Sequence, residues 1–314
     1  MSDGSEKPLV SVVIPCRGHA VPLSACLTSL ADQKVAGGYE VIVVDSAADP
    51  AVSELCARFP SVRLIRHSEG LLAGAARNLG ATQGRGDYLT FIDADCVAEP
   101  GWIAAITNAL RSGAKLVGGA VLHGKPLHPV AVIDNQMQFA NQAPGRPAGA
   151  EMLIPSCNIA MRRSDFEAVG GFPRTEQPTG EDGIFCQRVA ARWPDQTMFA
   201  PTARIRHFGR ETLRQFCVHQ YRFGHVRGIL LLNLTPFQRK LGRHLWMIPL
   251  VAFKRLIWLT GRAAAWDRAA LVKMLLYFPV LILGLAAWSL GFRNGCVHGD
   301  EILPSMDKAS HAAE

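Results

Sequence analysis

The sequence predicts an α/β fold in which a mainly parallel sheet is covered by helices on both faces. From residue 9 to about 120, short strands that are apolar throughout alternate with segments of helical periodicity. Apolar residues make up 49% of the 314 residues, which suffices for a full-sized core and excludes wholesale disorder. Carboxylates directly follow two of the strands, at the ends where such sheets bind ligands.

The predicted elements follow one another in a regular order. The expected strands are the apolar runs Leu9–Ile14, Val41–Val44, Val62–Ile65, Tyr88–Ile92 and Leu116–Val117. The expected helices have an apolar face or begin at a proline, and they cover residues 23–30, 50–59, 70–82 and 100–110. Strands separated by helices in this way indicate parallel pairing.

The periodicity changes after residue 120. From about His123 to Pro155 it fades, and Pro, Gly, Asn and Gln become frequent. In a second block, residues 156–228, a strand, a turn and a helix are expected from Ser156 to the glycine stop at Gly170-Gly171. Arg204–His207 ends a further short strand.

The charge is unevenly distributed along the chain. The 33 basic and 26 acidic residues give a formal charge of +7. Residues 1–229 carry 23 basic and 21 acidic side chains, whereas residues 230–293 carry nine basic and one acidic. Because the excess lies in one C-terminal stretch, it argues against a nucleic-acid-binding main body and favours attraction to anionic membrane lipids.

The same stretch contains a long uncharged run, Met274–Phe292, whose 19 residues are at the lower end of what spans a bilayer. More basic residues precede this run than follow it, so the positive-inside rule places the main domain in the cytoplasm, at a bacterial-type inner membrane. An earlier run, residues 245–259, is broken by Lys254 and Arg255 and suits a helix in the membrane interface. A buried hydrophobic helix of a soluble protein is the alternative for the uncharged run.

Cysteine usage and the N-terminus agree with a cytoplasmic main body. The eight cysteines are scattered without Cys-x-x-Cys spacing, which is typical of a reducing compartment. Residues 1–8 are polar and lack the features of a signal peptide.

Two groups of carboxylates at strand ends are candidates for binding chemistry. Asp93-Ala94-Asp95 follows a strand, and two carboxylates at i and i+2 can converge on a hard cation such as Mg²⁺ or Mn²⁺. The alternative is a turn in which the Asp side chains cap backbone N–H groups. Asp45 could likewise accept donors from a nucleobase or ribose, or cap its own turn.

Two further segments have a functional and a structural interpretation. Gly70–Gly80 is glycine-rich and includes Arg77, so it could approach a phosphate or only pack closely on the sheet. It lacks the G-x-G-x-x-G pattern of dinucleotide sites. Glu181-Asp182 opens a helix, where carboxylates favour the macrodipole and where one of them could act as a general base.

Together these segments resemble family 2 glycosyltransferases of the GT-A fold. The matching pieces are residues 10–15, 41–45, 76–80, 91–95, 158–172 and 181–182. They occur in the family's order over about residues 9–228. The resemblance implies a nucleotide-sugar donor, a divalent metal (Mg²⁺ or Mn²⁺), and a Rossmann-like nucleotide-binding sheet.

The resemblance also implies roles for individual residues. Asp45 would contact the base or ribose, Asp93 would lie near the ribose and diphosphate, and Asp95 would bind the metal. Asp182, with Glu181 beside it, would supply the catalytic base. The remaining implied contacts are Pro15, Arg17, Arg77, Asn78 and Ala94 for the nucleotide sugar, Asp93 and His207 for the metal, and Asn158, Gln220 and Arg222 for the acceptor and the segment that closes the site.

The expected domains follow from these assignments. Residues 1–229 would form the catalytic domain, with a nucleotide-sugar half at about 9–120 and an acceptor half at about 121–229. Residues 230–314 would form basic and hydrophobic membrane-associated helices, with a spanning helix at 274–292 and a short polar tail.

The expected activity is inverting transfer of one sugar to a hydroxyl of a glycan or lipid-linked acceptor, in cell-surface polysaccharide or glycolipid synthesis. The segment Gln220–Gly224 is similar to the aromatic and basic segment that closes many of these sites, but it departs from the Q-x-x-R-W form of processive synthases, which argues against polymer synthesis. The segment Asp45–Asp49 departs from the usual Asp-rich form, so the resemblance leaves the identity of the base open. A polyprenyl-phosphate glycosyltransferase is the nearest alternative. A nucleotidyltransferase would need a glycine-rich loop where Pro15–His19 stands, and a non-catalytic membrane adaptor would not need the carboxylates.

Overall fold

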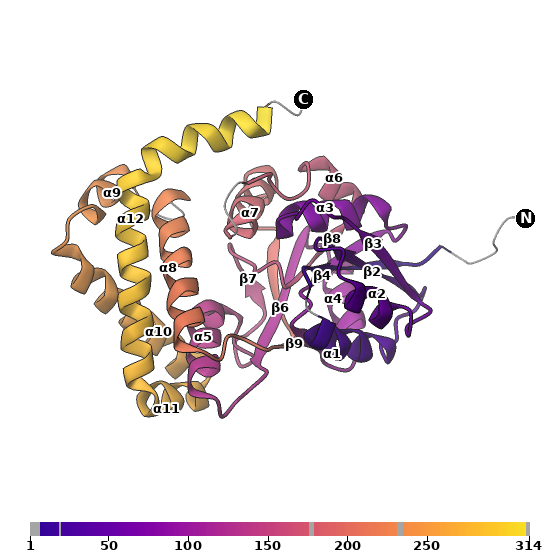
Figure 1. Cartoon of the computed structure of the whole chain (residues 1–314), viewed down its shortest axis with the longest axis horizontal. Coiled ribbons are helices and arrows are strands. Elements are labelled where there is room, and N and C mark those ends of the chain that lie inside the picture. The colour runs from indigo at the N-terminus through magenta and orange to yellow at the C-terminus, as the bar shows by residue number, and fades with distance from the viewer. Residues whose placement is uncertain (1–6, 19, 176–178, 231–234, 312–314) are drawn as a thin grey trace, which may run out of the picture. The chain divides into compact units, whose positions relative to one another are not determined.

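Figure 1 shows the computed structural model of the chain, which describes residues 7–18, 20–175, 179–230 and 235–311. His19 and the last three residues of the expected tail therefore lie outside the described residues. The chain forms two compact units. The first comprises Met1–Val121, Pro147–Pro173 and Phe185–Arg206, and the second comprises Leu122–Arg146, Arg174–Ile184 and His207–Glu314.

A mixed sheet of nine strands forms the core of the first unit. The strands are β1 (Val10–Cys16), β2 (Tyr39–Asp45), β3 (Val62–Arg66), β4 (Tyr88–Ile92), β5 (Cys96–Ala98), β6 (Leu116–His123), β7 (Gly149–Ala150), β8 (Asn158–Arg162) and β9 (Thr197–His207). Their order is β3-β2-β1-β4-β8-β6-β9-β5, and β7 pairs with β9. Pairing is parallel from β3 through β2 and β1 to β4, and β8 is antiparallel to both β4 and β6.

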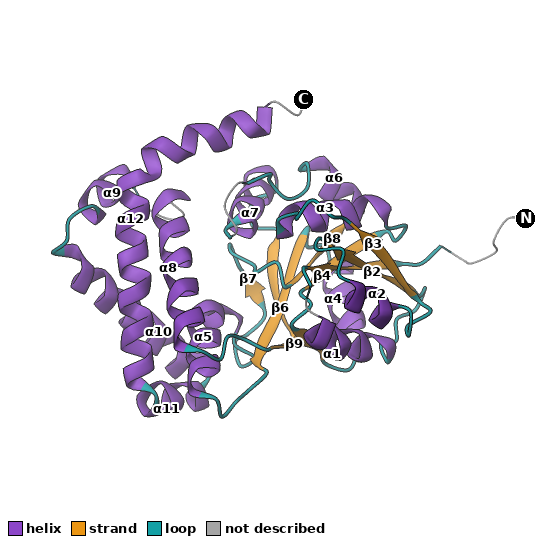
Figure 2. Ribbon diagram, viewed as in Figure 1, coloured by secondary structure: helices purple, strands orange, loops and turns teal. Residues whose placement is uncertain are grey.

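Helices cover both faces of this sheet, as Figure 2 shows. They are α1 (Ala20–Ala31), α2 (Pro50–Cys56), α3 (Ala73–Gln83), α4 (Trp102–Arg111), α6 (Arg163–Ala168) and α7 (Glu181–Arg192). Helices α3 and α6 lie on one face, and α1 and α4 lie on the other. The predicted α/β fold with a mainly parallel sheet is confirmed, and each of the five predicted strands and four predicted helices is present.

The face under α3, α6 and α7 is packed with aromatic rings. The Phe172 ring lies 4.4 Å from that of Phe185 and 5.2 Å from that of Phe91, measured between centroids. All three side chains are essentially fully buried. Since rings of this size contribute much of a core's free energy of burial, the cluster fixes α7 and the segment after α6 on the sheet.

The second unit is helical. Its helices are α5 (Pro129–Phe139), α8 (Leu213–Leu230), α9 (Pro236–Gly242), α10 (Met247–Trp266), α11 (Arg268–Leu276) and α12 (Phe278–His311), with a 3₁₀ turn at Ala140–Gln142. One cluster of buried side chains joins α5, α8, α10, α11 and α12, with Phe216, Leu259, Trp288 and Phe292 among its members. Helices α8 and α12 lie side by side (Figure 1).

The C-terminal region differs from the expectation in two ways. The uncharged run at 274–292 is not one helix, because α11 ends at Leu276 and α12 begins at Phe278. The part of α12 that is long and apolar enough to cross a membrane is Phe278–His298, and half of that window is buried. The backbone of the expected polar tail continues α12 as far as His311, and the sequence had made no prediction of its secondary structure.

The expected boundary near residue 230 does not coincide with the edge of a compact unit. Residues 122–146 and 207–229 cluster with the C-terminal helices, although they were assigned to the catalytic domain. Two of the helices involved, α5 and α8, contribute buried side chains to the core that α10 and α12 share. That the catalytic part of the chain ends at residue 229 and the membrane-associated part begins at residue 230 remains a prediction.

Candidate functional site

The carboxyl ends of β1, β2 and β4 meet at one edge of the sheet in the first unit. In the parallel register, Cys16 lies opposite Asp45 and Val13 lies opposite Phe91. The segments that follow these strands therefore begin side by side at the edge where open α/β sheets bind ligands. Pro15, Arg17, Asp45 and the segment Asp93–Asp95 are all at this edge.

Asp93, Ala94 and Asp95 form the turn between β4 and β5. The turn is closed by a hydrogen bond from Cys96 N to Asp93 O at 3.0 Å. Ala94 is buried, while the side chains of Asp93 and Asp95 are partly exposed. Two carboxylates in a tight turn supply the oxygen donors that a hard divalent cation prefers, so the residues fit such an ion.

Arg77 reaches this turn from α3. Its Nη2 donates to Asp93 Oδ1 at 2.6 Å, and its guanidinium lies over the Phe172 ring at 5.4 Å from the centroid. The Arg77 side chain is only 2% exposed, against 32% for that of Asp93. Arg77 was expected to contact the diphosphate, but a guanidinium buried in this way instead holds a carboxylate of the turn in place.

Asp45 caps its own turn. Its two carboxylate oxygens accept from Ala47 N at 3.0 Å and from Asp49 N at 2.6 Å, and the residue has no exposed surface. The sequence allowed either a contact with a base or ribose or a cap of the following turn, and the structure shows Asp45 capping the turn. A contact between Asp45 and a base would need a different arrangement of residues 45–49.

Asn78 is tied to the segment after α6. Its Nδ2 donates to Phe172 O at 2.8 Å, and its Oδ1 accepts from Phe172 N at 2.9 Å. Gly171 has a φ of +67°, and a Cβ there would stand 2.7 Å from Asn78 Oδ1. The second glycine of the Gly-Gly-Phe motif is therefore required because α3 and this segment approach too closely for a side chain at position 171.

Arg17 is an exposed cation at the carboxyl edge. It follows β1, and its Nη2 lies 3.5 Å from the point where a Cβ of Gly70 would stand. Gly18 and Gly70 both have a positive φ, at +67° and +70°. Since neither position carries a side chain, the guanidinium lies along the backbone before α3, where it can reach an anionic ligand.

Asn158 has a structural environment. Its Nδ2 donates to Ala120 O and Ala203 O, each at 3.0 Å, and its Oδ1 accepts from Trp102 Nε1 at 2.9 Å. The residue is fully buried in the sheet. The two bonds from Nδ2 use both hydrogens of the side-chain amide, so Asn158 has no side-chain donor left for the acceptor contact that was expected of it.

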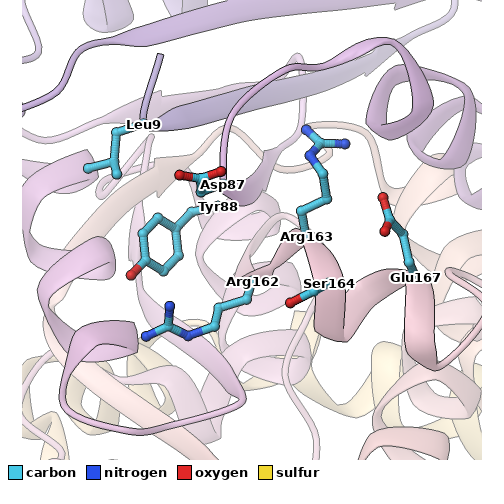
Figure 3. Close-up of a pocket in the computed structure, with 7 residues that line it drawn as sticks. All are labelled: Leu9, Asp87, Tyr88, Arg162, Arg163, Ser164 and Glu167. Carbon is cyan, nitrogen blue, oxygen red and sulfur yellow. The ribbon is translucent and has the colours of Figure 1, made fainter. Parts of the chain in front are cut away.

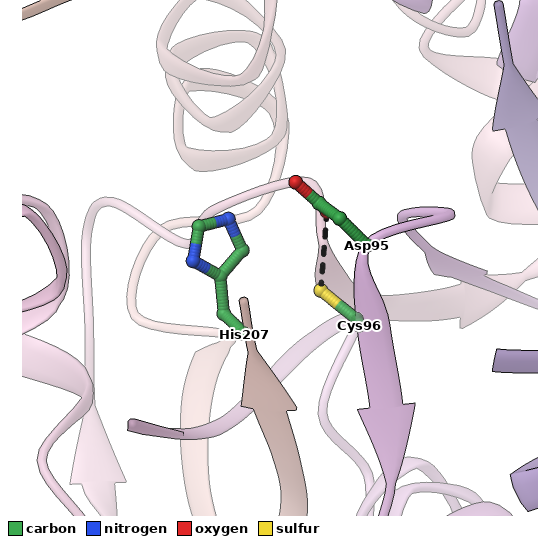
Figure 4. Close-up of side chains that lie close together, drawn as sticks. All are labelled: Asp95, Cys96 and His207. Carbon is green, nitrogen blue, oxygen red and sulfur yellow. Dashed lines mark hydrogen bonds between the residues drawn. The ribbon is translucent and has the colours of Figure 1, made fainter. Parts of the chain in front are cut away.

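Cys96 lies against the metal-binding candidate Asp95, as Figure 4 shows. The Cys96 thiol donates to Asp95 Oδ1 at a distance of 3.8 Å. Burial raises the pKa of this thiol well above its usual value, and the nearby Cys157, Asp95 and Asp93 raise it further. The burial of this group therefore favours a protonated thiol beside Asp95.

Asp182 and Glu181 begin α7 in the second unit. Asp182 Oδ1 accepts from Gly183 N at 2.8 Å, and Asp182 remains partly exposed, whereas Glu181 is buried. Arg227 of α8 faces Asp182. Burial lowers the pKa of the Arg227 guanidinium, and the charge of Asp182 opposes that shift. Of the two carboxylates, Asp182 is the one accessible to a reacting group.

A buried carboxylate that the sequence did not single out organises the second unit. Asp134 of α5 accepts from Gln220 Nε2 at 3.0 Å and from Arg210 Nη1 at 3.3 Å, and it lies 3.2 Å from His219 Nδ1. Asp134 has no exposed surface. The sequence did hold a signal for it, because Asp134 is the single acidic residue between positions 101 and 150.

The other predicted residues of the second unit differ in accessibility. Gln220 is buried and its amide is held by Asp134, whereas Arg222 is exposed on α8. His207 ends β9 and its ring lies 5.0 Å from that of Phe139 in an edge-to-face arrangement. Arg222 alone among these three presents its side chain to solvent.

A cavity of about 410 Å³ lies at the opposite edge of the sheet (Figure 3). Leu9 and Tyr88 line it at the amino ends of β1 and β4, and Arg162 stacks on Tyr88 at 5.0 Å. Arg163 is used structurally, because it donates to Gly86 O, Ala81 O and Ser11 Oγ. The cavity is therefore separate from the carboxylate turn and is no candidate for its substrate.

Comparison with known proteins identifies the family. Residues 11–170 match the family described as glycosyl transferase family 2, which is half of the chain. The chain therefore belongs to this family, and the resemblance drawn from its motifs is confirmed.

Several curated relatives are glycosyltransferases. The pre-mycofactocin glycosyltransferase of Mycobacterium tuberculosis is 26% identical over 222 residues, which cover 68% of this chain and 46% of the relative. Human polypeptide N-acetylgalactosaminyltransferase 15 is 36% identical over 195 residues (54% and 30%). Chondroitin synthase of Escherichia coli is 27% identical over 141 residues (43% and 21%). The chain covers less than half the length of each of these relatives.

Proposed function

We propose that the protein is an inverting glycosyltransferase that moves a sugar from a nucleoside-diphosphate sugar to a hydroxyl of a glycan or lipid-linked acceptor. The product would belong to a cell-surface polysaccharide or glycolipid. The observation that carries the proposal is the turn Asp93-Ala94-Asp95 at the carboxyl edge of the sheet, in a chain of glycosyl transferase family 2.

In this proposal the carboxylate turn and the end of β9 bind the metal. Asp95 and His207 are the expected ligands, with Asp93 held in place by Arg77. Support comes from the strand order, because β9 lies next to β5, which begins directly after Asp95. A bound Mg²⁺ or Mn²⁺ would neutralise charge that develops on the diphosphate. Arg17 would add a second positive charge at the same edge.

The transfer would proceed as a single displacement at the anomeric carbon. The bond from that carbon to the diphosphate oxygen breaks, and its electron pair leaves with the diphosphate. The acceptor oxygen forms the new bond on the opposite face, through an oxocarbenium-like transition state. Asp182 takes the proton of the acceptor hydroxyl, and Arg227 orients its carboxylate. Gln220 and Arg222 would contribute to the acceptor side.

We place the enzyme at the cytoplasmic face of a bacterial-type inner membrane. Support comes from the net positive charge of residues 230–293 and from the apolar segment Phe278–His298. Anionic lipids would then be partners of the second unit, close to a lipid-linked acceptor.

The test is a screen of nucleotide sugars with the purified full chain. We expect release of nucleoside diphosphate that requires Mg²⁺ or Mn²⁺ and stops with a chelator. Asp95→Ala and Asp182→Asn should each lower transfer by at least about 100-fold. Asp87→Asn, which alters an exposed ion pair with Lys7, is the matched control and should keep full activity.

The outcomes separate the candidate reactions. Full transfer by both active-site variants would overturn the assignment of the site. If Asp95→Ala is inactive while Asp182→Asn stays active, the acceptor is a phosphate such as a polyprenyl phosphate, because an ionised phosphate oxygen needs no base.

A further inference from the structure

Helices α10, α11 and α12 expose an unusual number of large apolar side chains. On α10, Leu250, Phe253 and Ile257 recur at intervals of three and four residues, so they share one helical face, and they are 53%, 60% and 55% exposed. On the opposite face, Leu259 and Ala263 are buried in the core of the second unit. Helix α10 therefore has apolar side chains on two opposite faces, although only one of these faces is packed.

The neighbouring helices extend this exposed surface. On α11, Leu275 and Leu276 are each more than two-thirds exposed, and on α12 Ile282 and Leu283 are also exposed. The three helices contact one another within the second unit. We call the exposed side chains on them the apolar surface; its members are Leu250, Phe253, Ile257, Val272, Leu275, Leu276, Phe278, Ile282 and Leu283. Exposed apolar side chains gathered on neighbouring helices in this way mark a partner or a membrane.

The charges beside the apolar surface favour a lipid partner. Lys254 on α10 and Arg268 on α11 are exposed. Asp267, the single acidic residue of the 230–293 stretch, is engaged as the cap of α11, where it accepts from Ala270 N at 2.9 Å. Exposed Trp246 and Trp258 add the amphipathic rings that are enriched at membrane interfaces. An anionic bilayer complements both the apolar and the basic side chains.

The packing of α12 decides between spanning the bilayer and lying on it. A Cβ on Gly224 of α8 would stand 1.9 Å from Trp288 O of α12, and one on Gly291 of α12 would stand 1.9 Å from Tyr221 O of α8. The two backbones are therefore in direct contact along the apolar segment of α12.

This contact fixes where α8 would lie if α12 crossed the membrane. Helix α8 exposes Arg214 and Arg222 beside the apolar segment of α12. A spanning α12 would carry both guanidiniums to the depth of the hydrocarbon, where each charge costs at least about 2.5 kcal/mol by insertion scales. The side of α12 that faces α8 is also buried by protein rather than available to lipid.

We propose that the second unit docks in the plane of one leaflet of an anionic bilayer through the apolar surface of α10, α11 and the start of α12, without spanning it. The inference rests on the membrane partner in the proposed function, but it is independent of the transfer chemistry. It assigns the membrane contact to helix faces rather than to a transmembrane helix.

Vesicle flotation with the purified full chain, without donor or acceptor, tests the contact. We expect strong binding to vesicles with about 30% phosphatidylglycerol and weak binding to pure phosphatidylcholine. The triple variant Leu250→Gln, Phe253→Gln, Ile257→Gln should bind at least about tenfold more weakly. The control is Val21→Gln, Leu127→Gln, Met152→Gln, which replaces three apolar residues elsewhere that are even more exposed (86%, 82% and 66%) and should bind like the wild type.

Protease access to tags at the two ends of the full chain shows whether α12 lies on the membrane or spans it. In inverted inner-membrane vesicles, protease should remove an N-terminal and a C-terminal tag alike, because both ends lie on the cytoplasmic side. Protection of the C-terminal tag alone would show a spanning helix and overturn the proposal. Unchanged vesicle binding by the α10 triple variant, with a change from dimer to monomer in sedimentation, would also overturn it and assign the surface to a second copy.

Discussion

At the scale of single residues, burial changes what Arg77 can do. An arginine in a glycine-rich segment is typical of a phosphate contact, yet this guanidinium lies between Asp93 and the Phe172 ring. A buried charge is stable only with its partner in place, so Arg77 and Asp93 constrain each other. Asp93 can then hold its position in the turn before any ligand arrives. The exposed Arg17 is the better candidate for contact with diphosphate.

The same region yields a prediction for Gly171. Gly171→Ala should lower the free energy of unfolding by about 2–4 kcal/mol, because alanine would adopt a φ of +67° and its Cβ would stand 2.7 Å from Asn78 Oδ1. The measurement is urea denaturation of the purified chain.

Gly170→Ala is the matched control for that prediction. Gly170 has a φ of +75°, but no atom of the described residues lies within 4 Å of its Cβ position. Gly170→Ala should lower the free energy of unfolding only by the cost of placing alanine in a left-handed backbone conformation, about 1–2 kcal/mol. Equal losses for the two variants would show that close approach to Asn78 contributes nothing.

At the scale of elements, glycines set the contact between α8 and α12. Gly224 and Gly228 of α8, and Gly291 and Gly295 of α12, each repeat at a spacing of four residues. A Cβ at any of these positions would fall within 2.5 Å of a main-chain atom of the other helix. Close backbone approach through small residues at this spacing maximises van der Waals contact.

Gly224→Ala should therefore separate the two helices and lower the free energy of unfolding by about 3 kcal/mol. Its control is Gly261→Ala on α10, where the described residues leave the Cβ position open. At that exposed helical site alanine should raise stability by about 0.5–1 kcal/mol. Thermal unfolding followed by circular dichroism gives both values, and the contact is refuted if both variants shift the midpoint upward.

At the scale of the whole molecule, the sequence predicted the features that depend on neighbouring residues, such as the bounds of single strands. The apolar run Tyr88–Ile92 is fully buried, and its strand bounds follow directly from its composition. Antiparallel pairing of β8 with β4 and β6 could not be predicted, because it depends on contacts between segments about 70 and 40 residues apart. Likewise, no periodicity reveals that α11 and α12 break at Tyr277.

The candidate site was predictable to the level of its motifs and no further. The order of carboxylates along the chain pointed to the turn at Asp93–Asp95, since a strand end is a local feature. The buried partners of these residues are set by the fold. Asp45 capping its turn, Asn158 bridging three strands and Asp134 holding Gln220 all require three-dimensional contacts between distant segments.

The buried His219 makes stability depend on pH. Burial lowers the pKa of His219 from 6.5 to about 4, although the hydrogen bond that His219 makes to Asp134 opposes this shift. The groups that face it are Asp134 of α5, together with Arg210 and His207. Since the unfolded chain binds this proton more readily than the folded chain, stability is complete above pH 6.5 and falls as the pH drops towards 4.

We therefore expect the free energy of unfolding to fall by about 3 kcal/mol between pH 7 and pH 4 on account of His219 alone. Urea denaturation at pH 7.0, 6.0, 5.0 and 4.5 measures the slope. His219→Asn, which keeps a polar group near Asp134 without a titrating proton, should flatten this part of the curve, whereas His244→Asn at an exposed position should leave it unchanged. The opposite pattern would assign the pH dependence to surface charge. Asp134 does not account for this part of the curve, because its interactions with His219 and Arg210 hold its pKa low despite its burial. Its contribution to stability is therefore lost only at still lower pH.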